Sequence, residues 1–179
     1  GNALCNLGLV HQLQGEMAEA REKLQASLQV AREMGHARLA SIVLCNLGIV
    51  DEAMGNFGDA LTHYEAALVM ARELGDRRCE GQYLGYLGTL HARQGRFDAA
   101  RLHLDAGARL LRDVPDLFNL GILLCGRAEM EWLSGRPELA STPLAEAEAI
   151  ANAVGAGTGS ELAAALRRVR SLLTGNRAA

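Results

Sequence analysis

The chain contains 179 residues, of which 49% are hydrophobic, 4% aromatic and 22% charged. Its formal net charge of −3, with both signs scattered along the sequence, excludes the clustered positive surface that nucleic acids and anionic membranes require, so neither is an expected partner. The sequence has no apolar run of about twenty residues and no signal peptide, and its four cysteines, interpreted as free thiols, indicate a cytoplasmic protein.

Taken from its start, the sequence repeats itself with a period of 40 residues. The segment LCNLG occupies residues 4–8 and again 44–48, YLG follows at 86–88, and AREMG at 31–35 corresponds to ARELG at 71–75. A fixed period of this size is typical of stacked helical units rather than of one globular core. Glycine recurs at one place in successive copies, namely Gly15, Gly55, Gly95, Gly135 and Gly175.

Each copy contains two stretches in which apolar residues recur at helical spacing. In the second copy, Leu44 and Leu47 belong to the first stretch, and Ala60 and Tyr64 belong to the second. The pattern predicts two amphipathic helices, and Gly55 between them can take the left-handed conformation that ends a helix. Each copy is therefore predicted to be a helical hairpin. The expected helices span residues 1–14, 17–34, 37–54, 57–74, 77–94, 97–112 and 116–134.

The fourth copy departs from the other three. Pro115 replaces a closing glycine and is expected at the first position of the next helix, where its missing N–H costs nothing. Arg127 stands where the other copies have leucine. The second helix of this copy is expected to begin at Pro137, and Pro143 then either kinks it or follows a fresh start capped by Thr142.

A last helix is predicted after the loop of residues 155–160. Ser160 can cap its first turn, and Leu162, Leu166 and Val169 share one side of it. This helix is therefore expected to cover the apolar edge of the fourth hairpin.

The repeated positions resemble the signature of the tetratricopeptide repeat (TPR) family. The period is similar to that of the longer TPR variety in GoLoco adaptors, kinesin light chains and the sensor arms of bacterial signalling ATPases and kinases. The matching residues are Leu44, Leu47, Gly48, Gly55, Ala60, Tyr64 and Ala67, with Leu4, Leu7, Gly8, Gly15, Ala20 and Leu24 in the first copy. The sequence departs from the pattern at position eleven, where the usual aromatic is replaced by His11, Asp51, His91 and Glu131, which leaves the packing there open.

The resemblance implies an all-α fold, a right-handed TPR superhelix of about four helical hairpins with a C-terminal capping helix. The small residues Gly48 and Ala60 would let two helices approach closely. Because the chain opens at Gly1 within a helical pattern, it is interpreted as a fragment of a larger protein. A single array over residues 1–179 is expected, with repeats at 1–40, 41–80, 81–120 and 121–158 and the cap at 160–173.

Three of the four cysteines share one position of the repeat. Cys5, Cys45 and Cys125 occupy it, and Gly85 replaces them in the third copy. Equivalent positions on neighbouring helices lie roughly 8 to 10 Å apart, which is too far for a disulfide. We therefore expect these three thiols to be free and buried, and Cys79 to be a separate thiol near a helix start.

No catalytic, cofactor or metal site is expected, and an enzyme is not predicted. The only lysine, Lys23, is not part of a phosphate-binding GK[ST] loop, and the five histidines lack the HExxH spacing of a zinc site. The segment GAGTG at 155–159 follows a predicted helix, whereas a dinucleotide-binding turn must follow a strand.

A binding surface remains as the functional candidate. In the family, the first helix of each hairpin lines a concave groove, and helical geometry places repeat positions 2, 6, 9 and 13 on that side. Asn6 and Asn46 share a register there and can hold the backbone of an extended peptide, unless each merely bonds a neighbouring helix. The candidate groove residues are Asn2, Asn6, Leu9, Leu13, Ile42, Asn46, Ile49, Gln82, Tyr86, Thr89, Arg93, Glu129 and Trp132.

The sequence thus predicts a non-catalytic protein–protein interaction scaffold within a larger signalling or regulatory protein. Its partner would be a protein segment, either an extended peptide or a helix, held in the groove. The alternative is a structural or autoinhibitory arm that packs on a catalytic domain of its own protein or self-associates.

Overall fold

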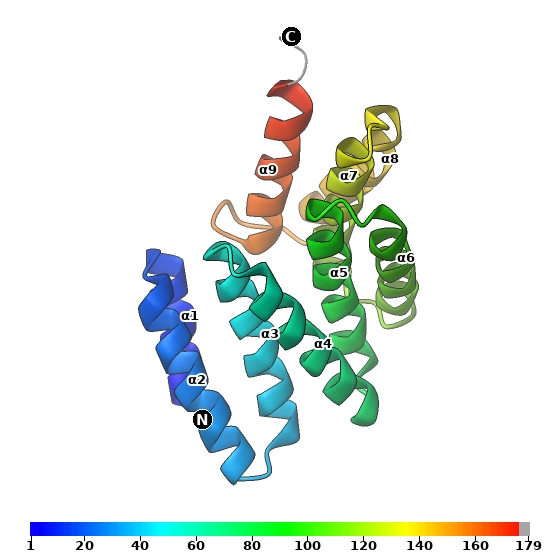
Figure 1. Cartoon of the computed structure of the whole chain (residues 1–179). Coiled ribbons are helices and arrows are strands. Elements are labelled where there is room, and N and C mark those ends of the chain that lie inside the picture. The colour runs from blue at the N-terminus through cyan, green and yellow to red at the C-terminus, as the bar shows by residue number, and fades with distance from the viewer. Residues whose placement is uncertain (176–179) are drawn as a thin grey trace. The chain divides into compact units, whose positions relative to one another are not determined.

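The computed structural model describes residues 1–175, and every regular element within that range is helical (Figure 1). The predicted all-α fold is confirmed, and the predicted ends of the helices before Pro137 lie close to the observed ones. The elements are α1 (Asn2–Gln14), α2 (Met17–Glu33), α3 (Ala37–Ala53), α4 (Phe57–Glu73), α5 (Arg77–Arg93), α6 (Phe97–Asp113), α7 (Leu117–Leu133), η1 (Pro137–Leu139), α8 (Ser141–Ala153) and α9 (Glu161–Gly175).

The chain forms two compact units. The first, Gly1–Cys79, holds α1 to α4 and the opening residues of α5, and the second, Glu80–Ala179, holds the rest of the chain. Within the first unit α1 packs on α2, α2 on α3, and α3 on α4. Within the second unit α6 packs on α7, and α7 packs on both α8 and α9. Consecutive helices therefore pack as in a helical-repeat array.

Glycine ends the helices in the predicted way. Gly55 has a φ of 80°, in the left-handed region that favours a residue without Cβ, and Gly75 has a φ of 65°. The turn after α3 is closed by the backbone N–H of Asn56, which donates to the carbonyl of Asp51 at 2.8 Å. The left-handed caps predicted at Gly55 and Gly75 are confirmed.

Small residues hold the two helices of a hairpin close together. A Cβ added at Gly48 in α3 would lie 2.5 Å from the ring of Tyr64 in α4, and one added at Gly88 would lie 2.6 Å from Leu104. Real Cβ atoms are not found at such distances, so only glycine fits without a shift of the buried neighbour. Ala60 is fully buried on the facing helix. The close approach predicted from Gly48 and Ala60 is confirmed.

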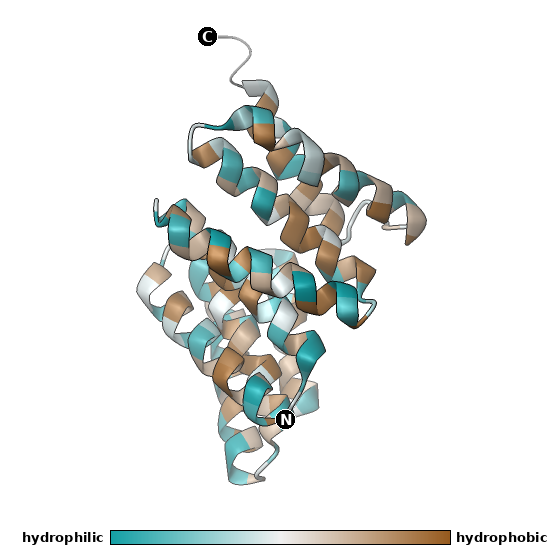
Figure 2. Cartoon of the chain, turned by 90° about the vertical axis from the view of Figure 1, so that its right-hand side faces the viewer, coloured by the Kyte–Doolittle hydropathy of each residue, from teal (hydrophilic) through white to brown (hydrophobic). Residues whose placement is uncertain are grey.

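Each helix carries both hydrophobic and hydrophilic residues (Figure 2), and the buried residues are mostly hydrophobic. In the first unit Val43, Leu47 and Val50 of α3 have no exposed surface. In the second unit Leu104 of α6 and Leu162 of α9 belong to one buried cluster. No helix of the described part of the chain is both long enough and apolar enough to cross a membrane.

Pro115 lies in the turn before α7 and not at the first position of this helix, so that prediction is wrong. The helix begins at Leu117, after Asp116. The Asp116 carboxylate accepts a hydrogen bond from the backbone N–H of Asn119 at 3.2 Å. Aspartate is a strongly preferred N-cap residue, and it moves the start of the helix beyond the proline.

Of the two alternatives for Pro143, the fresh helix start is confirmed, whereas the cap by Thr142 is wrong. The segment Pro137–Leu139 is a single 3₁₀ turn, and α8 begins afresh at Ser141 without a cap from Thr142. Pro143 therefore lies in the first turn of α8, where its missing N–H breaks no intrahelical hydrogen bond. The second helix of the fourth hairpin is shorter than predicted because one turn is lost to η1.

The last helix, α9, is capped as predicted. The Ser160 hydroxyl accepts a hydrogen bond from the backbone N–H of Ala163 at 3.2 Å. Leu162, Leu166 and Val169 are all buried. The apolar side predicted for this helix is thus confirmed, and it packs on α7 and α8.

Asp51, at repeat position eleven, is held by polar partners in place of aromatic packing. Its carboxylate has no exposed surface. Arg21 Nε of α2 donates to one oxygen at 2.7 Å, and His63 Nδ1 of α4 lies 2.7 Å from the other. This carboxylate joins the first hairpin to the second, and the partners offset the cost of burying its charge.

The equivalent groups in the second unit are also buried and polar. His91 stacks on His103 with ring centroids 5.1 Å apart and planes inclined by 14°. Glu131 pairs with Arg127 Nε at 3.0 Å and with Arg136 Nη2 at 3.0 Å. Position eleven, which the sequence left open, is therefore filled by stacked rings and ion pairs.

Candidate functional site

The candidate surface is the side of α1, α3, α5 and α7 that carries repeat positions 2, 6, 9 and 13. We call it the first-helix face and describe it separately in each unit. Its members in the first unit are Asn2, Asn6, Leu9, Leu13, Ile42, Asn46 and Ile49, and in the second unit Gln82, Tyr86, Thr89, Arg93 and Glu129.

In the first unit the first-helix face consists of aliphatic and asparagine side chains. Asn6 is exposed, and Leu13 is 84% exposed. Ile49 and Asn46 are half-buried beside it. Asn46 Nδ2 lies 3.6 Å from Cys5 Sγ, a bond to the neighbouring helix that uses one of the two N–H donors of the amide. None of the seven candidate residues here ionises, so together they offer a ligand amides and aliphatic side chains.

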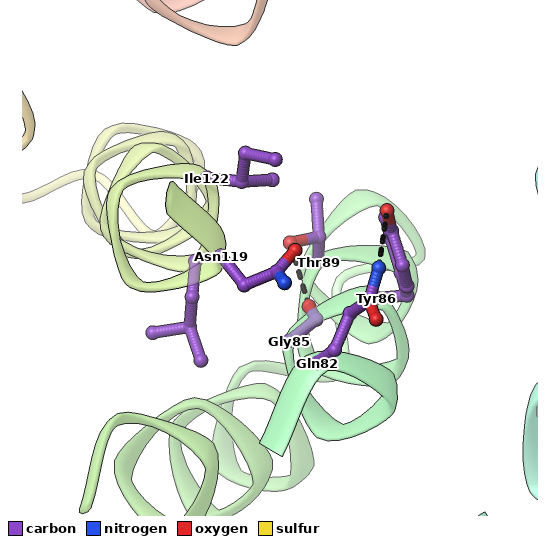
Figure 3. Close-up of a pocket in the computed structure, with 7 residues that line it drawn as sticks. Gln82, Gly85, Tyr86, Thr89, Asn119 and Ile122 are labelled. Atoms are coloured by element: carbon purple, nitrogen blue, oxygen red, sulfur yellow. Dashed lines mark hydrogen bonds between the residues drawn. The ribbon is translucent and has the colours of Figure 1, made fainter. Parts of the chain in front are cut away.

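In the second unit the first-helix face contains a small pocket between α5 and α7 (Figure 3). The cavity is about 20 Å³, which is room for one water-sized group. Glycine at position 85 leaves this space, because the other copies carry a cysteine there. The lining residues are Gln82, Gly85, Tyr86, Thr89, Asn119, Ile122 and Leu123.

The polar side chains of the pocket are ordered by bonds to one another and to the backbone. Gln82 Nε2 lies 3.5 Å from the Tyr86 hydroxyl, and the Thr89 hydroxyl donates to the Gly85 carbonyl at 3.0 Å (Figure 3). Asn119 extends from α7 towards α5 in the same view, and its Nδ2 donates to Asp116 Oδ2 at 2.7 Å. Carboxamides and hydroxyls offer both donors and acceptors, which suits an uncharged polar group such as a peptide bond.

Arg93 and Glu129 of the candidate set are bonded to each other. Arg93 Nε lies 2.7 Å and its Nη2 3.0 Å from the two oxygens of Glu129, a bidentate pair. Arg168 of α9 adds a third contact at 3.2 Å. Glu129 is only 4% exposed, and burial opposes its ionisation, yet Arg93 and then Arg168 outweigh burial and lower its pKa below the usual range.

The last helix reaches the first-helix face of the second unit at two places. The Tyr86 hydroxyl donates to Glu161 Oε1 of α9 at 2.7 Å, and Arg168 bonds Glu129 as described. Trp132, expected at the groove edge, is half-buried and lines a surface hollow together with Leu173 of α9. The sequence predicted α9 as an end cap but did not predict these contacts. The partner of a charged residue on α9 cannot be identified from the sequence pattern alone.

The thiols lie as predicted. Cys5, Cys45 and Cys125 are buried and form no disulfide, and Cys79 is half-buried. Burial raises the pKa of the Cys125 thiol to about 12, with smaller effects from charges that include Arg168. Such a thiol is a packing group, since the thiolate is the reactive form.

Comparisons with known proteins agree with the helical-repeat fold. A family model described as "MalT-like TPR region" matches residues 1–179. The crystal structure of BtubC (BKLC) from P. vanneervenii is similar with a TM-score of 0.71 and 17% identity, over 86% of this chain and 64% of that one. At this identity the likeness shows the fold alone, and this chain spans less than two thirds of that protein.

A tetratricopeptide repeat protein from Parabacteroides merdae matches with 18% identity over 98% of this chain and 86% of that one, at a TM-score of 0.33. No curated protein matches the chain.

Proposed function

Since the chain belongs to the family of MalT-like TPR regions, we propose that it is a non-catalytic interaction module that binds a segment of a partner protein on its first-helix face. TPR domains generally mediate protein interactions. The ligand would be an extended peptide, and the chain would act inside a larger signalling or regulatory protein in the cytoplasm.

The observation that carries the proposal is the chemistry of the first-helix face. In the first unit Asn6 and Asn46 occupy the same repeat position beside Leu9 and Ile49. An amide can donate to a peptide carbonyl and accept from a peptide N–H, and the aliphatic side chains can cover alternate side chains of the peptide. These groups support binding of a largely uncharged backbone in preference to a charged terminus.

The pocket beside Gly85 supports the same mode of binding in the second unit. It offers the amides of Gln82 and Asn119 and has room for one small group. Arg93 and Glu129 add little free charge to this face, because they are bonded to each other. A clamp for a carboxylate would need several free cations.

Direct binding tests this proposal. A display library of uncharged 12- to 15-residue peptides would be selected on the immobilised chain, and the best sequence titrated by calorimetry. The double variant Asn6→Ala/Asn46→Ala should weaken binding by roughly 0.5 to 1.5 kcal/mol per amide. Gln25→Ala, an amide removed from an exposed position on α2, is the matched control. Unchanged affinity in the double variant would assign the asparagines to helix packing and overturn the proposed mode.

A second candidate function is an arm that self-associates or packs on another domain of its own protein. Leu7 and Val10 of α1 are 42% and 47% exposed, although the equivalent Leu47 and Val50 are fully buried. This apolar side of α1 favours contact with another protein surface. Sedimentation velocity of Leu7→Ser/Val10→Ser against the native chain tests it, and a concentration-independent monomer in both cases would exclude self-association.

A further inference from the structure

We infer that α9 is an internal occupant of the first-helix face of the second unit, and that a partner segment reaches Tyr86 and Glu129 on this face by displacing it. The inference rests on the proposed function, because it describes how that same face is regulated. The competing ligand is the partner segment of the proposed function.

The contacts of α9 show that it lies along this face. Its first residue, Glu161, accepts a hydrogen bond from Tyr86 of α5, a residue of the pocket wall. Arg168, seven residues further on, bonds Glu129 of α7. Residues seven apart lie on the same side of a helix and about 10 Å apart along its axis. One side of α9 therefore forms hydrogen bonds with Tyr86 and Glu129, two of the residues that were predicted to bind a ligand.

The apolar side of α9 fills a site on α7 with defined shape. A Cβ added at Gly121 would lie 3.0 Å from the Leu162 side chain, so the two helices approach closely there. Leu162 and Leu166 belong to the buried cluster that includes Cys125, one turn from Gly121. The thiol of Cys125 is thus covered in part by α9, and its accessibility reports whether α9 is in place.

Several features make α9 separable from the rest of the unit. It is joined through residues 155–160, which include three glycines, and added Cβ atoms at Gly157 and Gly159 would meet nothing. A glycine-rich connection lets a helix leave its site without unfolding the hairpin before it. The polar contacts are accessible to water, since Glu161 is exposed and Arg168 has a side chain 47% exposed. Water can therefore replace both contacts when α9 leaves the face.

A thiol-labelling experiment on the full chain tests the inference. In a background of Cys5→Ser, Cys45→Ser and Cys79→Ser, Cys125 is the single reporter, and the rate of its alkylation by iodoacetamide is measured at pH 8. Glu161→Gln/Arg168→Gln should speed alkylation at least tenfold. Ser171→Ala, an exposed change on the same helix, should leave the rate unchanged. Circular dichroism of each variant verifies that the helices remain folded.

A competing peptide provides a second test of the inference. A fluorescein-labelled peptide of residues 160–175 should bind the Glu161→Gln/Arg168→Gln chain at least tenfold more tightly than the native chain, measured by anisotropy. Substituting the peptide arginine that corresponds to Arg168 by glutamine should weaken this binding. Equal binding to both chains, or alkylation of Cys125 at the same rate in both, would overturn the inference.

The two proposals can fail separately. If a selected peptide binds the native and the Glu161→Gln/Arg168→Gln chains with equal affinity, the regulatory role of α9 is excluded and the interaction function stands. If α9 is displaced by its own peptide but no selected peptide binds either chain, the interaction function is excluded.

Discussion

The Asp51 carboxylate illustrates how single side chains hold neighbouring hairpins in register. It is fully buried between Arg21 of one hairpin and His63 of its own. A buried ion pair adds little net stability compared with apolar packing, but it is satisfied in only one alignment of the helices. The polar residues at position eleven therefore specify which hairpins meet, whereas the leucine positions supply most of the burial.

Leu47 is such an apolar position. It has no exposed surface, whereas Leu13, on the first helix of the preceding hairpin, is 84% exposed. Leu47→Ala should lower the free energy of unfolding by about 2 to 5 kcal/mol through lost burial and a cavity. Leu13→Ala should change it by no more than about 0.5 kcal/mol. Urea denaturation of both variants measures the difference, and equal midpoints would contradict the core assignment of Leu47.

His91 should make the second unit sensitive to acid. Burial, followed by the charge of Arg96, lowers its pKa in the folded state. The unfolded chain takes up a proton near pH 6.5 while the folded chain does not, so stability falls as the pH drops from about 6.5 towards the folded pKa and is unaffected above that window. His91→Phe should flatten the dependence between pH 7.5 and 5.5. Parallel pH profiles for the two proteins, measured by urea denaturation, would refute this.

The sequence was most informative about residues whose role depends on their own hairpin. Gly55 has left-handed equivalents in other copies, and Tyr64 packs on Gly48 of its own hairpin as Leu104 does on Gly88, so periodicity alone located them. The pocket beside Gly85 needed Asn119 from the next hairpin, and the pairing of Glu129 with Arg93 and Arg168 joins three helices. Such contacts depend on how far apart the helices of neighbouring hairpins lie. The periodic pattern of apolar residues in the sequence does not give this distance. The position of Pro115 differs from the prediction for a local reason. Asp116 caps α7, so the helix begins after the proline.

The four cysteines provide a direct measure of helix packing. Cys5, Cys45 and Cys125 are buried and should react slowly with a maleimide, whereas the half-buried Cys79 near the start of α5 should react fastest. Labelling in native buffer followed by peptide mass spectrometry gives the four rates. Faster reaction at Cys45 than at Cys79 would contradict the observed packing of α3.

α9 should also protect the fourth hairpin from association. Removing the residues after Gly157 uncovers the surface that Leu162, Leu166 and Val169 otherwise cover. Exposed apolar patches promote self-association, so the shortened chain should sediment as larger species with rising concentration. A shortened chain that stays monomeric over the same concentrations as the native chain would show that α9 is not needed as a cap.

Considered as one chain, the protein should bind its partner with little dependence on salt. The candidate residues of the first unit are uncharged, and Arg93 is bonded to Glu129 in the second. Screening by salt weakens interactions between exposed charges, and few are available here. The affinity of the selected peptide should therefore change less than about threefold between low and moderate ionic strength. A steep loss of affinity in that range would point to a charged surface outside the first-helix face.

The succession of hairpins also has a consequence for how the chain folds. Each helix packs mainly on the helices next to it in sequence, as α2 does on α1 and α3. Short loops are closed with little entropy loss, so a topology of this kind has low contact order and reaches its native state in microseconds to milliseconds. Under a pulling force applied at its ends, the same arrangement should release its hairpins one after another in small steps, because each hairpin packs mainly on its neighbours.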